Sequence, residues 1–143
     1  MTVAAILNGK GRDVIAEKSG TLLSGICKVL AEKGIGAILV TDDDSRIEGI
    51  ISERDVVKAI GRQGAGALDL PVGDVMTRSV VTCVENDSIN DVMTKMSQGR
   101  FRHVPVVKDG KVAGLISIGD VVKYRIAQVE QEAEHMRSYI TTA

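Results

Sequence analysis

Two short segments of the sequence repeat one pattern of polar residues. Residues 49–57 read GIISERDVV and residues 114–122 read GLISIGDVV, so that in both copies a serine precedes an aspartate by three positions. Such a pair at the start of a helix forms a capping box, in which each side chain bonds a backbone N–H group. The same carboxylate can instead accept the hydroxyl groups of a ribose, while the helix N-terminus receives an anion. The motif alone leaves both functions open.

Cationic residues near the motifs favour a ligand that carries phosphate. Arg54 lies inside the first motif, whereas the second has Gly119, which lets a ligand approach the backbone closely. The second copy also contains the run GRFRHVPVV, which supplies Arg100, Arg102 and His103 beside its motif. Because cations at short range hold phosphate strongly, these residues point to an anionic ligand.

The composition excludes several classes of function. The 143 residues have a net charge of −1 and 2% aromatic residues, which favours neither nucleic acid nor anionic lipid as a partner. Cys27 and Cys83 are too few for a zinc framework, and neither His103 nor His135 lies in a metal-ligand or nucleophile pattern. We expect a cytoplasmic protein without a membrane span, a signal peptide, a metal site or a catalytic site.

The chain as a whole consists of two copies of one unit. Residues 14–60 align with residues 80–126, with one extra residue in a turn of the first copy. Each copy has a short strand, a helix with one apolar face, two strands joined by a polar turn, and a second helix. This order predicts an α+β fold of two β-α-β-β-α units that share one core, with a long C-terminal helix. The expected parts are a first domain over 3–63, a linker over 64–76, a second domain over 77–127 and a helical extension over 128–143.

These features together resemble a tandem pair of CBS domains (cystathionine beta-synthase domains), also called a Bateman module. The resemblance rests on the duplicated motif, on DVMTRSVVTC at the start of the second copy, and on FRHVPVVKDGKVAGLIS as its hairpin. It implies two subdomains packed sheet to sheet with pseudo-twofold symmetry, usually within a homodimer. It also implies two clefts that bind an adenine nucleotide as a regulatory ligand. AMP is favoured, and ADP, ATP, NAD(H) and S-adenosylmethionine are the other candidates.

The resemblance further implies which residues contact the nucleotide. Asp55 and Asp120 match the ribose-binding acids, with a serine three positions before each. The segment that precedes each copy closes over the cleft of the other, which places Lys10 at the second cleft and Thr77 at the first. The expected nucleotide-binding residues are Lys10, Arg12, Gly36, Ala37, Ser52, Arg54, Asp55, Thr77, Arg102, His103, Val104, Ser117, Gly119 and Asp120.

The two clefts are expected to differ in charge. The first copy has Gly36 and Ala37 where the second has Arg102 and His103, so the first cleft would rely on Arg54 and the second would suit a compact monophosphate. The predicted function is a regulatory sensor of adenine nucleotides, not an enzyme, that acts in trans on an unidentified protein partner. The alternative is a structural dimerisation scaffold in which both Ser-x-x-Asp motifs serve only as helix caps.

Overall fold

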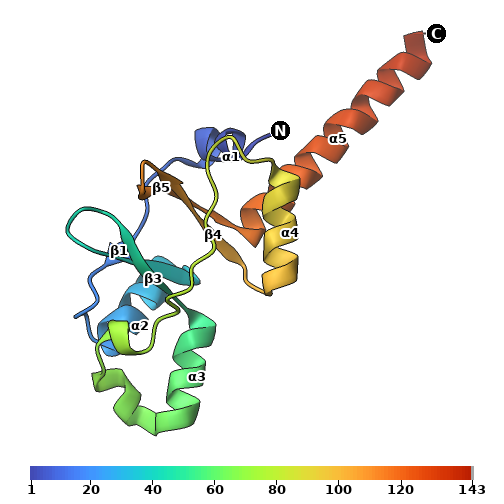
Figure 1. The fold of residues 1–143 in the computed structure, drawn as a ribbon. Helices are drawn as coiled ribbons and strands as arrows, with labels where there is room; N and C mark the ends of the chain where they lie inside the picture. Colours follow the sequence, from blue (N-terminus) through green and yellow to red (C-terminus); the bar gives the residue numbers. More distant parts are fainter. Residues whose placement is uncertain (143) are drawn as a thin grey trace.

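The repeated pattern folds into two similar units, and a long helix extends from the second (Figure 1). The computed structural model describes residues 1–142; Ala143, the last residue of the expected helical extension, lies outside them. The first unit contains β1 (Ala16–Glu17), α2 (Leu23–Lys33), β2 (Ala37–Thr41), β3 (Ile47–Ser52) and α3 (Glu53–Gln63). The second contains α4 (Ile89–Gly99), β4 (His103–Lys108), β5 (Lys111–Ser117) and α5 (Ile118–Thr142). The expected α+β fold with a long C-terminal helix is confirmed.

Each unit is built around a strand hairpin. In the first unit β2 lies between β1, which is parallel to it, and β3, which is antiparallel. In the second unit β4 and β5 are antiparallel, and the counterpart of β1 is a single parallel bridge between Cys83 and Val106. Every residue of β2 is buried, and four of the five are apolar, as in a strand covered on both faces.

The first helix of the chain, α1 (Val3–Lys10), was not expected from the sequence, and it packs on the second unit. Val3, Ile6 and Leu7 lie in the hydrophobic cluster of that unit, although the sequence assigned residues from 3 onward to the first domain. Backbone bonds from Val3 N–H to the Asp87 carbonyl and from Ala4 N–H to the Glu85 carbonyl hold the helix there.

The segment between the two copies makes the reciprocal contact. It contains the short helices η1 (Gly64–Asp69) and η2 (Val72–Asp74), and its residues Ala67, Val72 and Met76 belong to the hydrophobic cluster of the first unit. The segment that leads into each repeat therefore completes the core of the other repeat. Most buried side chains of residues 1–142 fall into one cluster for each unit, and the fully buried Leu39 of β2 belongs to neither cluster. A core shared by the two units stays a prediction.

The two hairpins meet at both of their ends. At the turns, Val112 N–H donates to the Ser45 carbonyl at 3.0 Å. At the opposite end the ring of His103 occupies the space beside Gly36, where a Cβ atom would lie 3.3 Å from His103 Cε1. This arrangement brings the start of β4 next to the start of β2, and it decides which residues share a cleft.

Candidate functional site

A cavity of about 810 Å³ lies between the two units, at the N-terminus of α3. The first Ser-x-x-Asp motif forms one wall with Ser52, Arg54 and Asp55. The segment after η2 contributes a second wall, and the residues that join α4 to β4 form the third. The lining residues from these two segments are Thr77, Ser79, Val80, Val81, Gly99, Arg100, Phe101, Arg102 and His103.

Asp55 divides its two carboxylate oxygens between the helix cap and the cavity. Oδ2 accepts from the Ser52 N–H at 2.9 Å and from Ser52 Oγ at 3.0 Å, and Asp55 N–H donates to Ser52 Oγ at 3.3 Å, which completes the capping box. Oδ1 accepts from Thr77 Oγ1 at 3.1 Å. Thr77 is held in place by paired backbone bonds with Ile50, each 2.9 Å long. A capping role therefore leaves Oδ1 available to a ligand, so the two functions of the motif are compatible.

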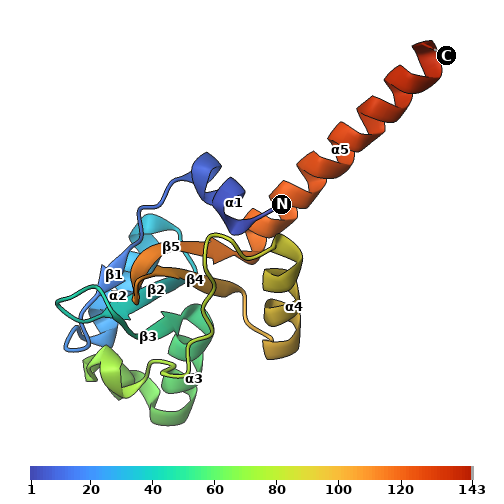
Figure 2. The same cartoon turned by 45° about the horizontal axis from the view of Figure 1, so that its top comes forward.

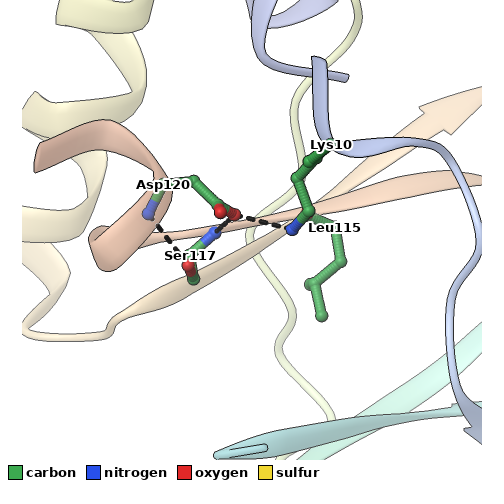
Figure 3. A network of polar contacts seen from close by, with 4 residues as sticks. All are labelled: Lys10, Leu115, Ser117 and Asp120. Atoms are coloured by element: carbon green, nitrogen blue, oxygen red, sulfur yellow. Dashed lines mark hydrogen bonds and ion pairs between the residues drawn. The ribbon is translucent and has the colours of Figure 1, made fainter. Parts of the chain in front are cut away.

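Asp120 has the same cap and a different neighbour (Figure 3). Its Oδ2 accepts from the Ser117 N–H at 2.9 Å, and its own N–H donates to Ser117 Oγ at 3.1 Å. The same Oδ2 also accepts from Lys10 Nζ at 2.6 Å, and Lys10 Nζ donates to the Leu115 carbonyl at 2.9 Å. Burial by itself would raise the pKa of Asp120, but the Lys10 ammonium and the Ser117 N–H outweigh it and hold this pKa below its ordinary value.

The positive charge gathers at the cavity beside Asp55. Besides Arg54, the exposed side chains of Lys58, Arg100 and Arg102 line it, so the expectation that this cleft would rely on Arg54 was wrong. The reason is that β4 starts against β2, which turns the residues before β4 toward the cleft of the other copy. Arg54 Nη1 also donates to the Arg100 carbonyl across the cavity at 3.1 Å.

Arg100 stands in a backbone conformation that is unusual for its residue type. It ends α4 with φ of +57°, and the end of α2 has Gly34 with φ of +61° at the corresponding position. Left-handed helix ends favour glycine, and other residues kept there often lie at functional sites. An arginine at this point presents both a side chain and a carbonyl acceptor to the cavity.

His103 lies between the two Ser-x-x-Asp motifs. Burial lowers the pKa of its imidazole below the ordinary value, and the Asp120 and Glu53 carboxylates, one from each motif, oppose that shift. His103 also lines the cavity beside Asp55. A change in charge at either motif therefore shifts the pKa of the same ring.

A family model described as CBS domain matches residues 11–62 and again residues 72–127. This chain belongs to the CBS domain family. The CBS domain-containing protein ATU1752 of Agrobacterium tumefaciens superposes with a TM-score of 0.84 at 45% identity, over 87% of this chain and 92% of that one.

Other CBS proteins of known structure were determined with adenosyl ligands. The CBS domain pair of protein MJ0100, in complex with 5′-methylthioadenosine and S-adenosyl-L-methionine, superposes with a TM-score of 0.80 at 26% identity over 90% of this chain and 98% of that one. The CBS domain protein PAE2072 of Pyrobaculum aerophilum, complexed with AMP, superposes with a TM-score of 0.75 at 25% identity, over 84% of this chain and 89% of that one. The mitochondrial CBS domain-containing protein CBSX3 of Arabidopsis thaliana is 32% identical over 79% of this chain, which spans 57% of that protein's length. None of the helices described here is long and apolar enough to cross a membrane.

The structure separates the expected nucleotide-binding residues of this CBS pair into groups. Lys10 and Ser117 gather at Asp120, with Gly119 next to Ser117. Arg12 turns away from it and pairs with Glu85 at 2.5 Å. Ala37 and Val104 are buried, and neither lines the cavity. The residues that the cavity brings together are Gly36, Ser52, Arg54, Asp55, Thr77, Arg102 and His103.

Sequence reasoning missed several residues that line the cavity, including Lys58 and Phe101, and it named Arg100 only as a cation of the second copy. Lys58 follows Arg54 by four positions on α3, and that spacing places both on one face of the helix. A search for cations one helical turn after the motif would have found it. The side chains of the segment that joins α4 to β4 depend on how the two units face each other, which no local pattern records.

Proposed function

We propose that this CBS pair is a regulatory module that binds an adenine nucleotide in the cavity beside Asp55. The observation that carries the proposal is the cavity itself, which is lined both by Asp55, whose Oδ1 is not used by the helix cap, and by a group of cations. The complexes of PAE2072 with AMP and of MJ0100 with adenosyl compounds support the same class of ligand.

The cavity offers a partner for each part of such a ligand. Asp55 Oδ1 would accept the ribose hydroxyl groups, and Ile50, Val80 and Val81 supply apolar surface for the adenine ring. Arg54, Lys58, Arg100 and Arg102 would bind the phosphate by charge-assisted hydrogen bonds. AMP remains the favoured ligand, and this group of cations could hold ADP or ATP as well.

The signal would come from the position of the cavity between the two units. A ligand that contacts α3 and the start of β4 together favours one relative orientation of the units. It can shift that equilibrium only by the difference between its affinities for the two states. This CBS pair would then act in trans on a protein partner, as a regulator and not as an enzyme, and a cytoplasmic location stays a prediction.

The long helix α5 supports a homodimer as the working form. Its exposed apolar residues alternate at spacings of four and three positions, which is the pattern of a coiled-coil seam. In a parallel pair of α5 helices, Arg125 would face Glu130 of the second copy, and Glu132 would face Arg137. Opposite charges meet in both pairs, which favours the parallel arrangement. The seam residues are Val122, Ile126, Val129, Ala133, Met136 and Ile140.

Thermal unfolding with added nucleotides tests the proposed function. AMP, ADP, ATP, NAD, NADH and S-adenosylmethionine would each be added to the wild-type protein, to Asp55→Ala and to Asp43→Ala, whose aspartate is fully exposed in a turn. A ligand at one hundred times its Kd should add about 2.7 kcal/mol of stability. We expect wild type and Asp43→Ala to show this shift and Asp55→Ala to lose most of it. If no nucleotide shifts the wild-type melting temperature, the structural scaffold becomes the better interpretation.

A further inference from the structure

The residue before each hairpin holds the first backbone N–H group of the helix that follows that hairpin. Gly36, before β2, accepts from the Glu53 N–H at 3.0 Å, and Arg102, before β4, accepts from the Ile118 N–H at 2.8 Å. The first N–H groups of a helix have no acceptor within the helix, so these bonds satisfy them from outside. The starts of α3 and α5 are therefore each fixed to one residue.

The two acceptors differ in what else they can contact. Gly36 has no side chain, whereas Arg102 lines the cavity beside Asp55 with an exposed side chain. Within residues 1–142 the Arg102 guanidinium has no hydrogen-bond or ion-pair partner, although Arg54 in the same cavity already donates to the Arg100 carbonyl. Arg102 thus offers an unused cation to the cavity and its carbonyl to α5.

The place of Arg102 in the chain lets a ligand change the strength of that bond. Arg102 lies between the end of α4 at Gly99 and the start of β4 at His103, in neither a helix nor a strand. Exposed segments of this kind open more readily than packed elements. A phosphate that fixes the guanidinium would keep the Arg102 carbonyl on the Ile118 N–H for more of the time.

We propose, resting on the proposed function, that Arg102 transmits occupancy of the cavity to the first turn of α5. A charge-assisted hydrogen bond from the guanidinium to a phosphate orders Arg102, and its carbonyl then orders the start of the helix. Gly36 has no side chain through which to pass the same signal to α3. The signal therefore reaches the helix of 25 residues that carries the exposed apolar row, and not the helix of 11 residues.

Amide hydrogen exchange, resolved residue by residue by NMR, tests this transmission. The exchange rate of the Ile118 N–H would be measured in wild type, Arg102→Gln and Lys58→Gln, each without ligand and saturated with AMP. Arg102→Gln removes the charge and keeps the carbonyl. Lys58→Gln removes another exposed cation of the same cavity, which lies within α3. The internal control is the Val92 N–H, bonded to the Ser88 carbonyl at 3.2 Å near the start of α4.

We expect AMP to slow the exchange of the Ile118 N–H at least about tenfold in wild type and in Lys58→Gln, the effect of one charge-assisted hydrogen bond. In Arg102→Gln saturated with AMP the rate should not change, and the Val92 N–H should keep its rate throughout. Adenosine has no phosphate, so saturation of wild type with adenosine should leave the Ile118 rate unchanged. That comparison needs no variant and replaces Arg102→Gln if the variant fails to fold or to bind AMP.

Two results would overturn the inference and leave the proposed function standing. One is an Ile118 rate that AMP does not change in wild type, and the other is an equal slowing in wild type and Arg102→Gln. In both cases the thermal shift still shows that the nucleotide binds. A wild-type protein that binds no nucleotide overturns both proposals.

Discussion

Asp55 and Asp120 show how a single residue type serves stability and binding together. In each, Oδ2 holds the backbone N–H of the preceding serine, so the first turn of the helix is capped whether or not a ligand is present. The second partner of each carboxylate differs. Asp55 accepts from the Thr77 hydroxyl, whereas Asp120 accepts from the Lys10 ammonium. The same motif therefore produces two chemically different sites.

The half-buried imidazole of His103 predicts a dependence of stability on pH. Because the pKa of His103 in the folded protein lies below its ordinary value of 6.5, the unfolded chain binds more protons as the pH falls through that value. The free energy of unfolding of the wild type should therefore decrease from pH of about 7.5 to about 5.5, and decrease less in His103→Gln.

Urea unfolding at several pH values between these limits measures the slope. The control is His135→Gln, which removes an exposed histidine from α5 and should keep the wild-type slope. Identical slopes for wild type and His103→Gln would show that the ring is not held in its neutral form.

At the scale of elements, the glycine that opens each motif, Gly49 or Gly114, leaves room for the segment that precedes the other repeat. A Cβ atom at Gly49 would lie 2.5 Å from Met76 Sδ and 2.8 Å from the Thr77 carbonyl oxygen. A Cβ atom at Gly114 would lie 2.9 Å from Leu7 Cδ2. In both repeats a segment from elsewhere in the chain therefore crosses the strand where no side chain is present.

These contacts predict unequal costs for the two glycine-to-alanine substitutions. Gly49→Ala should lower the free energy of unfolding by about 1–3 kcal/mol, because the backbone at Thr77 must shift. Gly114→Ala should lower it by less, since the nearest atoms belong to the side chain of Leu7 and not to the backbone. Urea denaturation measures the free energy of unfolding of both variants.

Gly61→Ala provides the matched control for this pair. Gly61 lies within α3 with no atom close to the position of a Cβ, so alanine there should stabilise the protein by about 0.5–1 kcal/mol. A Gly49→Ala protein as stable as wild type would contradict the close packing of the Thr77 backbone against Gly49 in β3.

Much of this arrangement could be predicted from local sequence. The duplicated helices and hairpins, the serine caps and the long last helix follow from periodicity and capping signals, and the structure has them. The short strand expected at the start of the second copy is only a single bridge between Cys83 and Val106. The helix α1 could not be predicted, because eight residues form a stable helix only through burial of Val3 and Leu7 in a distant core. The prediction of the charge in the first cleft failed for the same reason. Arg100 and Arg102 reach that cleft only through the packing of the two units.

At the scale of the whole molecule, α5 leaves the body of the protein soon after it begins (Figures 1 and 2). Val121 is fully buried, whereas Val122 is 49% exposed and Ile140 is 70% exposed. A continuous row of exposed apolar residues on a helix marks an interaction surface. The heptad spacing and the charges beside it make a second copy the partner that fits best.

Charge reversal tests the parallel α5 pair. Wild type should behave as a dimer in light scattering, and Arg125→Glu/Arg137→Glu should dissociate it by placing like charges opposite each other. Adding Glu130→Arg and Glu132→Arg to that variant should restore the dimer. Glu134→Arg, on the side of α5 away from the seam, is the control and should not change the mass. A wild-type monomer, or a dimer that ignores the reversal, would contradict this arrangement.

The packing of α1 on the second unit also sets the order in which the chain can fold. Val3, Ile6 and Leu7 are synthesised well before their packing partners, which extend to Val121. At translation rates of about 5–20 residues per second, the N-terminal segment waits several seconds for those partners. Closing so long a loop carries a high entropic cost and slows folding. The second unit is thus completed last, and until then a newly made chain exposes a short apolar segment to which chaperones could bind.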